Sequence, residues 1–218
     1  MTDADETWLR QRVIDTALEM SRSGLSPGRS GNVSARAGAH MLITPSGMAY
    51  DDLLPDDIVA MGLDGSVAEG QRPPSSEWHF HVAVYRARPE MGGVVHSHSP
   101  FATSLACLHR DIPAFHYMVA VAGGSDIRCA PYATFGTMEL AEHAVAALVG
   151  RKACLLSHHG QIAVAETVEK ALELGHEVET LAEHYWRALQ IGEPKILDEA
   201  EMARVLRKFE TYGMQLET

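Results

Sequence analysis

Apolar residues recur at helical spacing in six stretches of the chain. In residues 7–24 they fall on one side of a helix, with polar residues on the other side. The same pattern predicts further helices over residues 76–88, 99–109, 137–149, 167–189 and 199–209. Ser75 or Ser76 is expected to cap the helix that starts at 76, and Thr167 the longest one, because their hydroxyls accept hydrogen bonds from free N–H groups.

Short apolar runs lie between these predicted helices, bounded by turn-forming residues. They predict strands over residues 33–36, 41–44, 57–61, 93–98, 127–130, 153–157 and 162–165. Asp64-Gly65 predicts a hairpin turn. Hairpin-spaced strands interspersed with helices favour an α/β fold, in which a mixed sheet is covered on both faces by helices. With 218 residues, 46% hydrophobic composition and no repeats or linker, the chain fits one domain over residues 1–218.

The charge and the ends of the chain narrow the class of partner. A formal net charge of -11 argues against nucleic acid or an anionic membrane surface, which are held through excess Lys and Arg. No apolar run is long enough to span a bilayer, and no signal peptide is evident, so a cytoplasmic protein is expected. Cys107, Cys129 and Cys154 are widely spaced without a Cys-x-x-Cys, which predicts reduced, buried thiols.

His96 and His98 form the strongest chemical signal in the chain. They end an apolar run, and residues i and i+2 of a strand project from the same face, so both imidazoles are expected on one side. A lone histidine is more often a surface or hydrogen-bonded core residue than a ligand. Two on one strand face supply half of a zinc site, which needs three or four protein ligands.

Two further segments offer the remaining ligands. His158 and His159 follow a second apolar run, and only one of them can share the face of the first pair if the strand continues; His159 is favoured because Gly160 lets the chain turn close to an ion. Glu77 lies at a predicted helix start and is the candidate fourth ligand, or a ligand that leaves to act as general base. Its structural alternative is a glutamate stabilised by the helix dipole. His81, four residues on, is a rival for the same ion.

Three segments have the chemistry of an anion site. Ser75 and Ser76 lie beside the free N–H groups of a helix start, and the turns at 31–32 and 46–47 are rich in backbone donors. Each alone is typical of an ordinary turn or cap, so only their convergence would bind a phosphate. Neither a Walker loop nor a dinucleotide fingerprint is present.

Lysine and tyrosine add little on their own. Lys152, Lys170, Lys195 and Lys208 have polar settings, so none is expected to form a Schiff base, and carbanion chemistry would need the metal. Tyr117 and Tyr212 are expected by default to pack in the core with a satisfied hydroxyl.

Taken together, these segments resemble a known family, the class II zinc-dependent aldolases and epimerases. The resemblance rests on the ordered segments SGNVS at 30–34, LITPSG at 42–47, PSSE at 74–77, VHSH at 95–98 and HHG at 158–160. Segments HYM at 116–118, AGG at 122–124, CAPYATFGT at 129–137 and KFETYG at 208–213 are similar to the L-fuculose-1-phosphate aldolase branch. The resemblance implies a three-layer α/β/α subunit with a mixed, mostly antiparallel sheet, assembled as a homotetramer with active sites between subunits.

The resemblance also implies roles for individual residues. Zinc, or another divalent ion such as Mn²⁺ or Co²⁺, would be held by Glu77, His96, His98 and His159. The substrate phosphate would be held by Asn32, Ser46, Gly47, Ser75 and Ser76, with Ser30 and Gly31 in the same loop. Glu77 would also be the base, and Tyr117 would reach a neighbouring subunit's site as proton donor, helped by a mobile tail bearing Tyr212. Arg29 departs from the family, whose residue there is usually small and uncharged; it either contacts the phosphate or is solvated.

The implied reaction is zinc-dependent retro-aldol cleavage of a ketose 1-phosphate to dihydroxyacetone phosphate and an aldehyde. L-fuculose 1-phosphate is the first candidate substrate. Relatives that cleave 5-deoxyribulose or 5-methylthioribulose 1-phosphate in salvage pathways are the main alternative, since the aldehyde end makes few contacts. A sugar-phosphate 4-epimerase and a non-catalytic interaction module on the same fold, as in the adducin head, are the other two.

Overall fold

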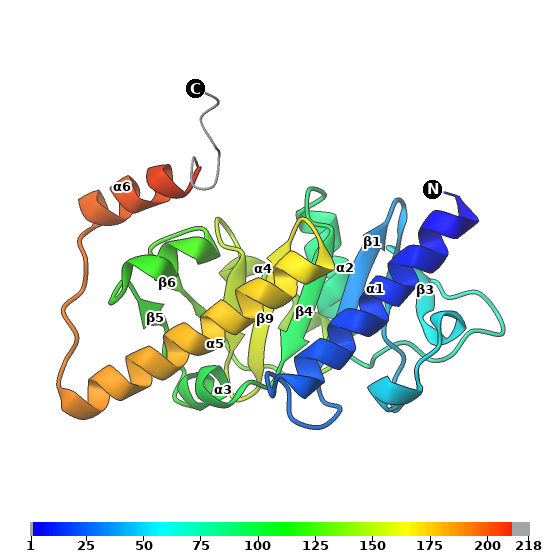
Figure 1. Ribbon diagram of the computed structural model, residues 1–218, viewed down its shortest axis with the longest axis horizontal. Helices are drawn as coiled ribbons and strands as arrows, with labels where there is room; N and C mark the ends of the chain where they lie inside the picture. The colour runs from blue at the N-terminus through cyan, green and yellow to red at the C-terminus, as the bar shows by residue number, and fades with distance from the viewer. Residues whose placement is uncertain (1, 211–218) are drawn as a thin grey trace.

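The computed structural model of the chain describes residues 2–210 and consists of helices and short strands in alternation (Figure 1). The helices are α1 Asp3–Arg22, α2 Trp78–Ala87, α3 Pro100–Cys107, α4 Met138–Ala147, α5 Val168–Ile191 and α6 Glu199–Glu210, with 3₁₀ turns η1 Tyr50–Asp52, η2 Pro55–Asp57 and η3 Tyr117–Ala122. The strands are β1 Asn32–Ala37, β2 His40–Ile43, β3 Val59–Gly62, β4 Gly93–Ser97, β5 Ile112–Pro113, β6 Asp126–Ile127, β7 Cys129–Ala130, β8 Ala153–Leu156 and β9 Gly160–Ala165.

Seven strands form the central sheet in the order β3-β2-β1-β4-β9-β8-β7. All neighbouring pairs are antiparallel except β7 and β8, which are parallel. In the middle of the sheet, β4 lies between β1 and β9, with Asn32 opposite His96 and His96 opposite Ile162. The predicted mixed, mostly antiparallel sheet is confirmed.

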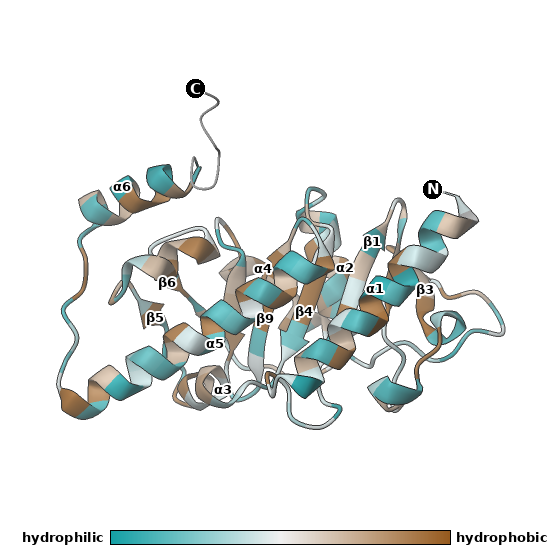
Figure 2. Ribbon diagram, in the orientation of Figure 1, coloured by the Kyte–Doolittle hydropathy of each residue, from teal (hydrophilic) through white to brown (hydrophobic). Residues whose placement is uncertain are grey.

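Helices cover both faces of this sheet, so the fold has three layers. Figure 1 shows α1 and α5 lying across the near face, with α2 behind the sheet. The strands alternate accordingly: Met41 and Ile43 pack in a core with Phe80 of α2 and Leu140 of α4, whereas Leu42 points into the core beneath α1. In Figure 2, α1 and α5 show hydrophilic and hydrophobic patches in alternation along their length, as expected of helices with one buried face.

Several predicted boundaries differ from the structure. The stretch 127–130 is not one strand: β6 pairs with β5 in a separate two-stranded sheet, and β7 joins the edge of the main one. Residue 57 belongs to η2, so the third strand starts at Val59. Thr167 does cap α5, by accepting a hydrogen bond from the backbone N–H of Lys170.

Two expectations about single residues are wrong. Neither Ser75 nor Ser76 is the N-cap of α2; Glu77 holds that position, and the Ser75 hydroxyl accepts from the Glu77 N–H before the helix begins. Cys107 is exposed, because it lies in the last position of a short helix whose buried face is carried by Ala102, Leu105 and Ala106. Cys129 and Cys154 are buried as predicted.

Among the described helices, none combines the length and the apolar composition needed to cross a bilayer.

Candidate metal centre and active site

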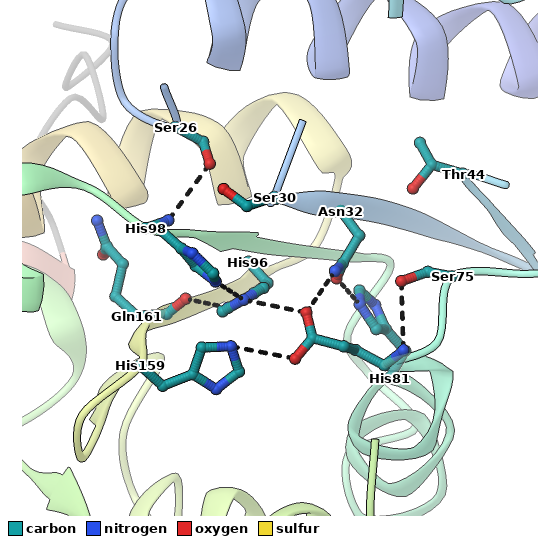
Figure 3. Close-up of polar contacts among 12 residues, drawn as sticks. Ser26, Ser30, Asn32, Thr44, Ser75, His81, His96, His98, His159 and Gln161 are labelled. Atoms are coloured by element: carbon teal, nitrogen blue, oxygen red, sulfur yellow. Dashed lines mark hydrogen bonds and ion pairs between the residues drawn. The ribbon is translucent and has the colours of Figure 1, made fainter. Parts of the chain in front are cut away.

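Four side chains converge at one end of the central strands β4 and β9. Ligand atoms of Glu77, His96, His98 and His159 all lie within 4.8 Å of one another. The His96 Nε2 atom is 3.0 Å from His98 Nε2 and 3.3 Å from Glu77 Oε2, and His159 Nε2 is 3.1 Å from Glu77 Oε1. Figure 3 shows the three imidazoles turned toward one another. Of the described residues, no other His, Cys, Asp or Glu group meets as closely.

Adjacent strands of the sheet place these ligands. His96 lies on β4 and His98 directly after it, so the two rings project from one side as the sequence indicates. His159 lies in the turn between β8 and β9, and β9 pairs with β4. Glu77 enters from the other layer, as the first residue before α2. Strand pairing therefore fixes His96 itself, and the other three ligands lie within one residue of a strand or helix end.

The His158–His159 turn separates two adjacent histidines. His158 adopts a left-handed backbone conformation with φ 56°, and its exposed ring lies edge-on to Tyr132, outside the ligand group. Gly160 lets its strand approach the backbone of Ser97 closely because it has no side chain, and not because its φ is positive. A Cβ at Gly160 would collide with the carbonyl oxygen of Ser97 and come within 3.1 Å of the His98 ring.

His81, the rival ligand, is fully buried and lies outside the group. Its Nδ1 atom is 2.7 Å from the Ser34 hydroxyl, and its Nε2 atom is 2.6 Å from Asn32 Oδ1. Asn32 in turn donates through Nδ2 to Glu77 Oε2 at 2.9 Å. His81 therefore reaches the candidate ligand set only through Asn32.

Burial and charge act together on the titratable groups. Burial raises the pKa of Glu77, but the charges and hydrogen bonds of His96 and His159 outweigh it and hold that pKa well below its usual range. Burial, then the charges of His96 and His159, lowers the pKa of His98 to about 4. At neutral pH the site thus presents a carboxylate and at least one neutral imidazole, which are the protonation states that metal ligands need.

The donor set fits a divalent metal ion. His96 Nδ1 is 2.9 Å from the carbonyl oxygen of Gln161 and therefore donates to it, which leaves Nε2 as the nitrogen that faces the group. Glu77 Oε1 is buried and makes no well-directed hydrogen bond, although His159 Nε2 lies within ion-pair distance. Three imidazole nitrogens and a carboxylate oxygen with spare capacity are the ligands that zinc takes.

The group opens into a pocket of about 410 Å³. All three predicted anion-binding segments line it together with the candidate ligands Glu77, His98 and His159. The lining residues from those segments are Arg29, Ser30, Gly31, Asn32, Ser46, Gly47, Ser75 and Ser76. Their convergence, which spacing alone could not reveal, is present in the structure.

Comparison with known proteins shows the family of this chain. The family model of the class II aldolase and adducin N-terminal domain matches residues 11–186, which is most of the chain. The chain belongs to this family. A 5-methylthioribulose-1-phosphate/5-deoxyribulose-1-phosphate aldolase from Rhodospirillum rubrum is 58% identical over 205 residues, covering 94% of this chain and 92% of the relative. An L-fuculose phosphate aldolase from Escherichia coli is 52% identical over 210 residues, covering 96% and 97%.

A solved structure shows that the chain also has the fold of a class II aldolase. An L-fuculose 1-phosphate aldolase superposes with a TM-score of 0.91 at 40% identity, covering 96% of this chain and 98% of that one. The chain is accordingly a class II aldolase, which is a lyase. These two curated relatives carry different substrate names, so the comparisons fix the reaction class and not the sugar.

Among the described residues of this class II aldolase, Tyr117 does not line the metal pocket. Tyr117 begins η3 and is 51% exposed, so the expectation that it packs in the core is wrong. It lines a separate apolar pocket of about 730 Å³ between η3 and α6, with Phe115, Leu197 and Phe209 among its neighbours. Tyr212 lies outside the described residues.

Two contributors to the site lacked a clear signal in the sequence. The buried Tyr50 hydroxyl donates to the Gly31 carbonyl oxygen, and burial together with the charge of Glu77 raises its pKa to about 12. Gln161 orients His96 through its backbone carbonyl, and its buried side chain donates to the Ser99 hydroxyl and the Gly175 carbonyl oxygen. The turn at 44–47 was the sequence signal nearest to Tyr50. Gln161 had no signal, because a backbone carbonyl can accept a hydrogen bond whatever the side chain is.

Proposed function

We propose that the chain, as one domain over residues 1–218, catalyses metal-dependent retro-aldol cleavage of a ketose 1-phosphate. The products are dihydroxyacetone phosphate and an aldehyde. One observation carries the proposal: a four-residue ligand group shares its pocket with three donor-rich segments suited to a phosphate. A substrate anchored by its phosphate would thereby have its carbonyl end beside the metal ligands.

The proposed ligands are Glu77, His96, His98 and His159, holding Zn²⁺ or an ion of similar preference such as Mn²⁺ or Co²⁺. When bound, the ion supplies Lewis-acid stabilisation of the negative charge that develops as the C3–C4 bond breaks. Nothing in the reaction then needs a Schiff base, and Lys152 and Lys170 are paired with Glu166 at the surface.

Glu77 is the proposed general base. Its carboxylate is only 5% exposed, is ionised because of the adjacent histidines, and is held at one oxygen by the Asn32 amide. The other oxygen, Oε1, makes no well-directed hydrogen bond and is therefore the atom best suited to hold the proton exchanged with the nucleophilic carbon.

The phosphate is proposed to bind backbone and hydroxyl donors of the three convergent segments. Gly47 has a φ of 77°, and such turns direct successive N–H groups toward a bound anion. Arg29 donates to the Gly47 carbonyl oxygen at 3.4 Å, so its guanidinium bridges two of the three segments at the mouth of the pocket. Arg29 is therefore proposed to contact the phosphate, since the other described residues that line this pocket include no lysine or arginine.

A second subunit is proposed to complete the site. Tyr117 is exposed and lies apart from the metal pocket of its own subunit, so it is suited to serve a neighbouring one as proton donor to the aldehyde oxygen. A homotetramer with active sites at its interfaces would bring it there. Tyr212 is proposed to assist from the C-terminal tail.

Two substrate types follow from the relatives. L-fuculose 1-phosphate and 5-methylthioribulose or 5-deoxyribulose 1-phosphate share the phosphorylated ketose end and differ at the aldehyde end. The exposed aromatic side chains Tyr132 and Phe135 line the pocket and offer apolar contact, which suits the thioether or deoxy end as well as the methyl of fuculose. The relatives' names favour both types over a 4-epimerase or a non-catalytic module.

The test is a coupled assay for dihydroxyacetone phosphate, run on L-fuculose 1-phosphate and 5-methylthioribulose 1-phosphate with and without a chelator. We expect release that the chelator abolishes and added zinc restores. The ratio of the two kcat/KM values identifies the physiological type. If zinc-loaded protein releases nothing from either sugar, the aldolase proposal fails, and epimerase activity and then the non-catalytic module become the hypotheses to test.

A further inference from the structure

A chain of buried hydrogen bonds runs from Glu77 into the core. Glu77 accepts from Asn32, Asn32 Oδ1 lies 2.6 Å from His81, His81 lies 2.7 Å from the Ser34 hydroxyl, and that hydroxyl lies 3.0 Å from the Tyr85 hydroxyl. All five residues are at most 5% exposed. Figure 3 shows Asn32 and His81 facing each other beside the metal group.

The polarity of this chain follows from its charged end. A carboxylate can only accept, so Asn32 must present its nitrogen to Glu77 and its oxygen to His81. His81 must therefore carry its hydrogen on Nε2, which leaves a lone pair on Nδ1. The Ser34 hydroxyl donates to that lone pair, so toward Tyr85 its oxygen can only accept. The single hydrogen of the Tyr85 hydroxyl is then shared between the Ser34 hydroxyl oxygen at 3.0 Å and the Ser34 carbonyl oxygen at 2.9 Å.

His81 is held neutral, as this arrangement requires. Burial, then the charge of His96, lowers the pKa of His81 to about 3. A neutral ring with Nε2–H is the tautomer that can accept from Ser34 and donate to Asn32 at the same time. The Glu77 carboxylate thus sets the direction of the whole chain of hydrogen bonds, and the Nε2–H of His81, with Nδ1 held by the Ser34 hydroxyl, reinforces the orientation of the Asn32 amide that Glu77 requires.

The orientation of Asn32 matters to the pocket as well as to Glu77. Its amide nitrogen carries two hydrogens, of which one goes to Glu77, and Asn32 also lines the pocket. A flipped amide would present an oxygen to the carboxylate and to an incoming phosphate, and both contacts would be repulsive. We infer that His81, held at Nδ1 by the Ser34 hydroxyl, is a positioning residue that keeps the Asn32 nitrogen toward both the Glu77 carboxylate and the substrate phosphate.

The position of these hydrogen-bonded residues supports a positioning role for His81 rather than a role in core packing alone. Asn32 lies opposite His96 in the β1–β4 pairing. The hydrogen-bonded series Glu77–Asn32–His81–Ser34–Tyr85, called the relay below, therefore meets the site beside a candidate ligand. Buried polar groups cost stability relative to apolar packing unless every partner is satisfied, and here each link finds one. The inference rests on the proposed function, since the phosphate and the base are those of the aldolase reaction.

The test compares three variants as zinc-loaded protein. His81→Leu removes the donor, whereas His81→Gln retains an N–H near the position of Nε2. His79→Leu is the matched control, because His79 lies on the same helix, stacks on Trp78 at 3.8 Å and takes no part in the relay. Inorganic phosphate affinity is measured by calorimetry, kcat and KM by the coupled assay, and zinc affinity by competition with a chelator.

We expect His81→Leu to weaken phosphate binding and to lower kcat by about 10- to 100-fold, the usual range for groups that orient ligands, with His81→Gln recovering most of both. His79→Leu should match the wild type. Ser34→Ala, a smaller change, should give an intermediate loss if His81→Leu does not fold. The inference is overturned if His81→Gln is as impaired as His81→Leu, or if folded His81→Leu binds phosphate and turns over like the wild type.

Failure of the proposed function gives a different pattern. Wild-type protein would then cleave neither sugar phosphate, while the comparison of phosphate affinities among the variants would still decide whether His81 positions Asn32.

Discussion

At the scale of single residues, the site depends on which atom of each polar group faces the centre. Glu77 is buried, ionised and held by Asn32 at one oxygen only. His96 is fixed by a backbone carbonyl that directs its Nε2 inward. Identity and spacing reveal such residues as candidates, but the direction of each hydrogen bond is decided by the neighbouring group.

Glu77→Gln tests the base role at this scale. The amide keeps the volume and one coordinating oxygen but cannot take the proton, so we expect kcat to fall by about 10²- to 10⁴-fold while zinc and the assembly are retained. Steady-state kinetics with metal analysis measures this. Glu166→Gln, which removes a surface carboxylate paired with Lys152, is the control and should leave kcat unchanged. Unchanged turnover in Glu77→Gln would remove it from the base role.

The neutral His81 makes the stability of the metal-free protein depend on pH. Its pKa is about 3 when folded and about 6.5 when unfolded, so below pH 6.5 the unfolded state binds a proton that the folded state does not. Stability should therefore fall as pH drops, by about 2 kcal/mol from this group between pH 6.5 and 5. His98 acts in the same direction. Urea unfolding across this range measures the slope, and an equal slope in His81→Gln would contradict the assignment.

At the scale of elements, periodicity predicted most helices and strands, because one-sided burial leaves its mark on residue order. It failed where contacts between distant segments determine the local structure. Residues 127–130 are split between two sheets, and the Ser75 hydroxyl accepts from the Glu77 N–H instead of capping α2. His96 and His98 were paired correctly because a strand has period two. His159 could be preferred over His158 only weakly, since the left-handed turn that separates them is not encoded by a glycine or asparagine.

Gly160→Ala tests how closely β9 must approach β4. The added methyl would press on the Ser97 carbonyl and the His98 ring, so we expect a loss of about 1–3 kcal/mol in the free energy of unfolding and weaker zinc binding. Thermal or denaturant unfolding and chelator competition measure the two effects. Gly192→Ala is the matched control, because its φ of 169° is extended and no neighbouring atom of residues 2–210 lies within 4 Å of the place that the added methyl would take. Equal zinc affinity in both variants would show that the close approach does not shape the site.

At the scale of the whole molecule, two well-separated pockets concern the proposed reaction. The metal pocket has polar and apolar lining residues and lies at one end of the central strands β4 and β9, whereas Tyr117 lines an apolar pocket between η3 and α6. Figure 1 shows α6 standing at the end of a long connection, beyond α5. The proposed assembly joins these two regions from different subunits.

Mixing inactive subunits tests that assembly. Glu77→Gln and Tyr117→Phe should each have low activity alone, because one lacks the base and the other the proton donor. Unfolding and refolding the two together should restore activity, since some interfaces then combine an intact Glu77 with an intact Tyr117. Light scattering gives the oligomeric state and the coupled assay the turnover. A mixture no more active than the mean of its components would place both residues in one subunit's site or remove Tyr117 from the reaction.

The buried relay also has a consequence for how this sequence can drift. Each member dictates the donor or acceptor character of the next, so a change at Asn32, His81 or Ser34 alone leaves an unmatched polar atom in the core. Descendants of such a gene can exchange these residues only in concert. Across related genes, positions 32, 34 and 81 should therefore either stay fixed or substitute as a correlated set, while His79 on the same helix varies independently.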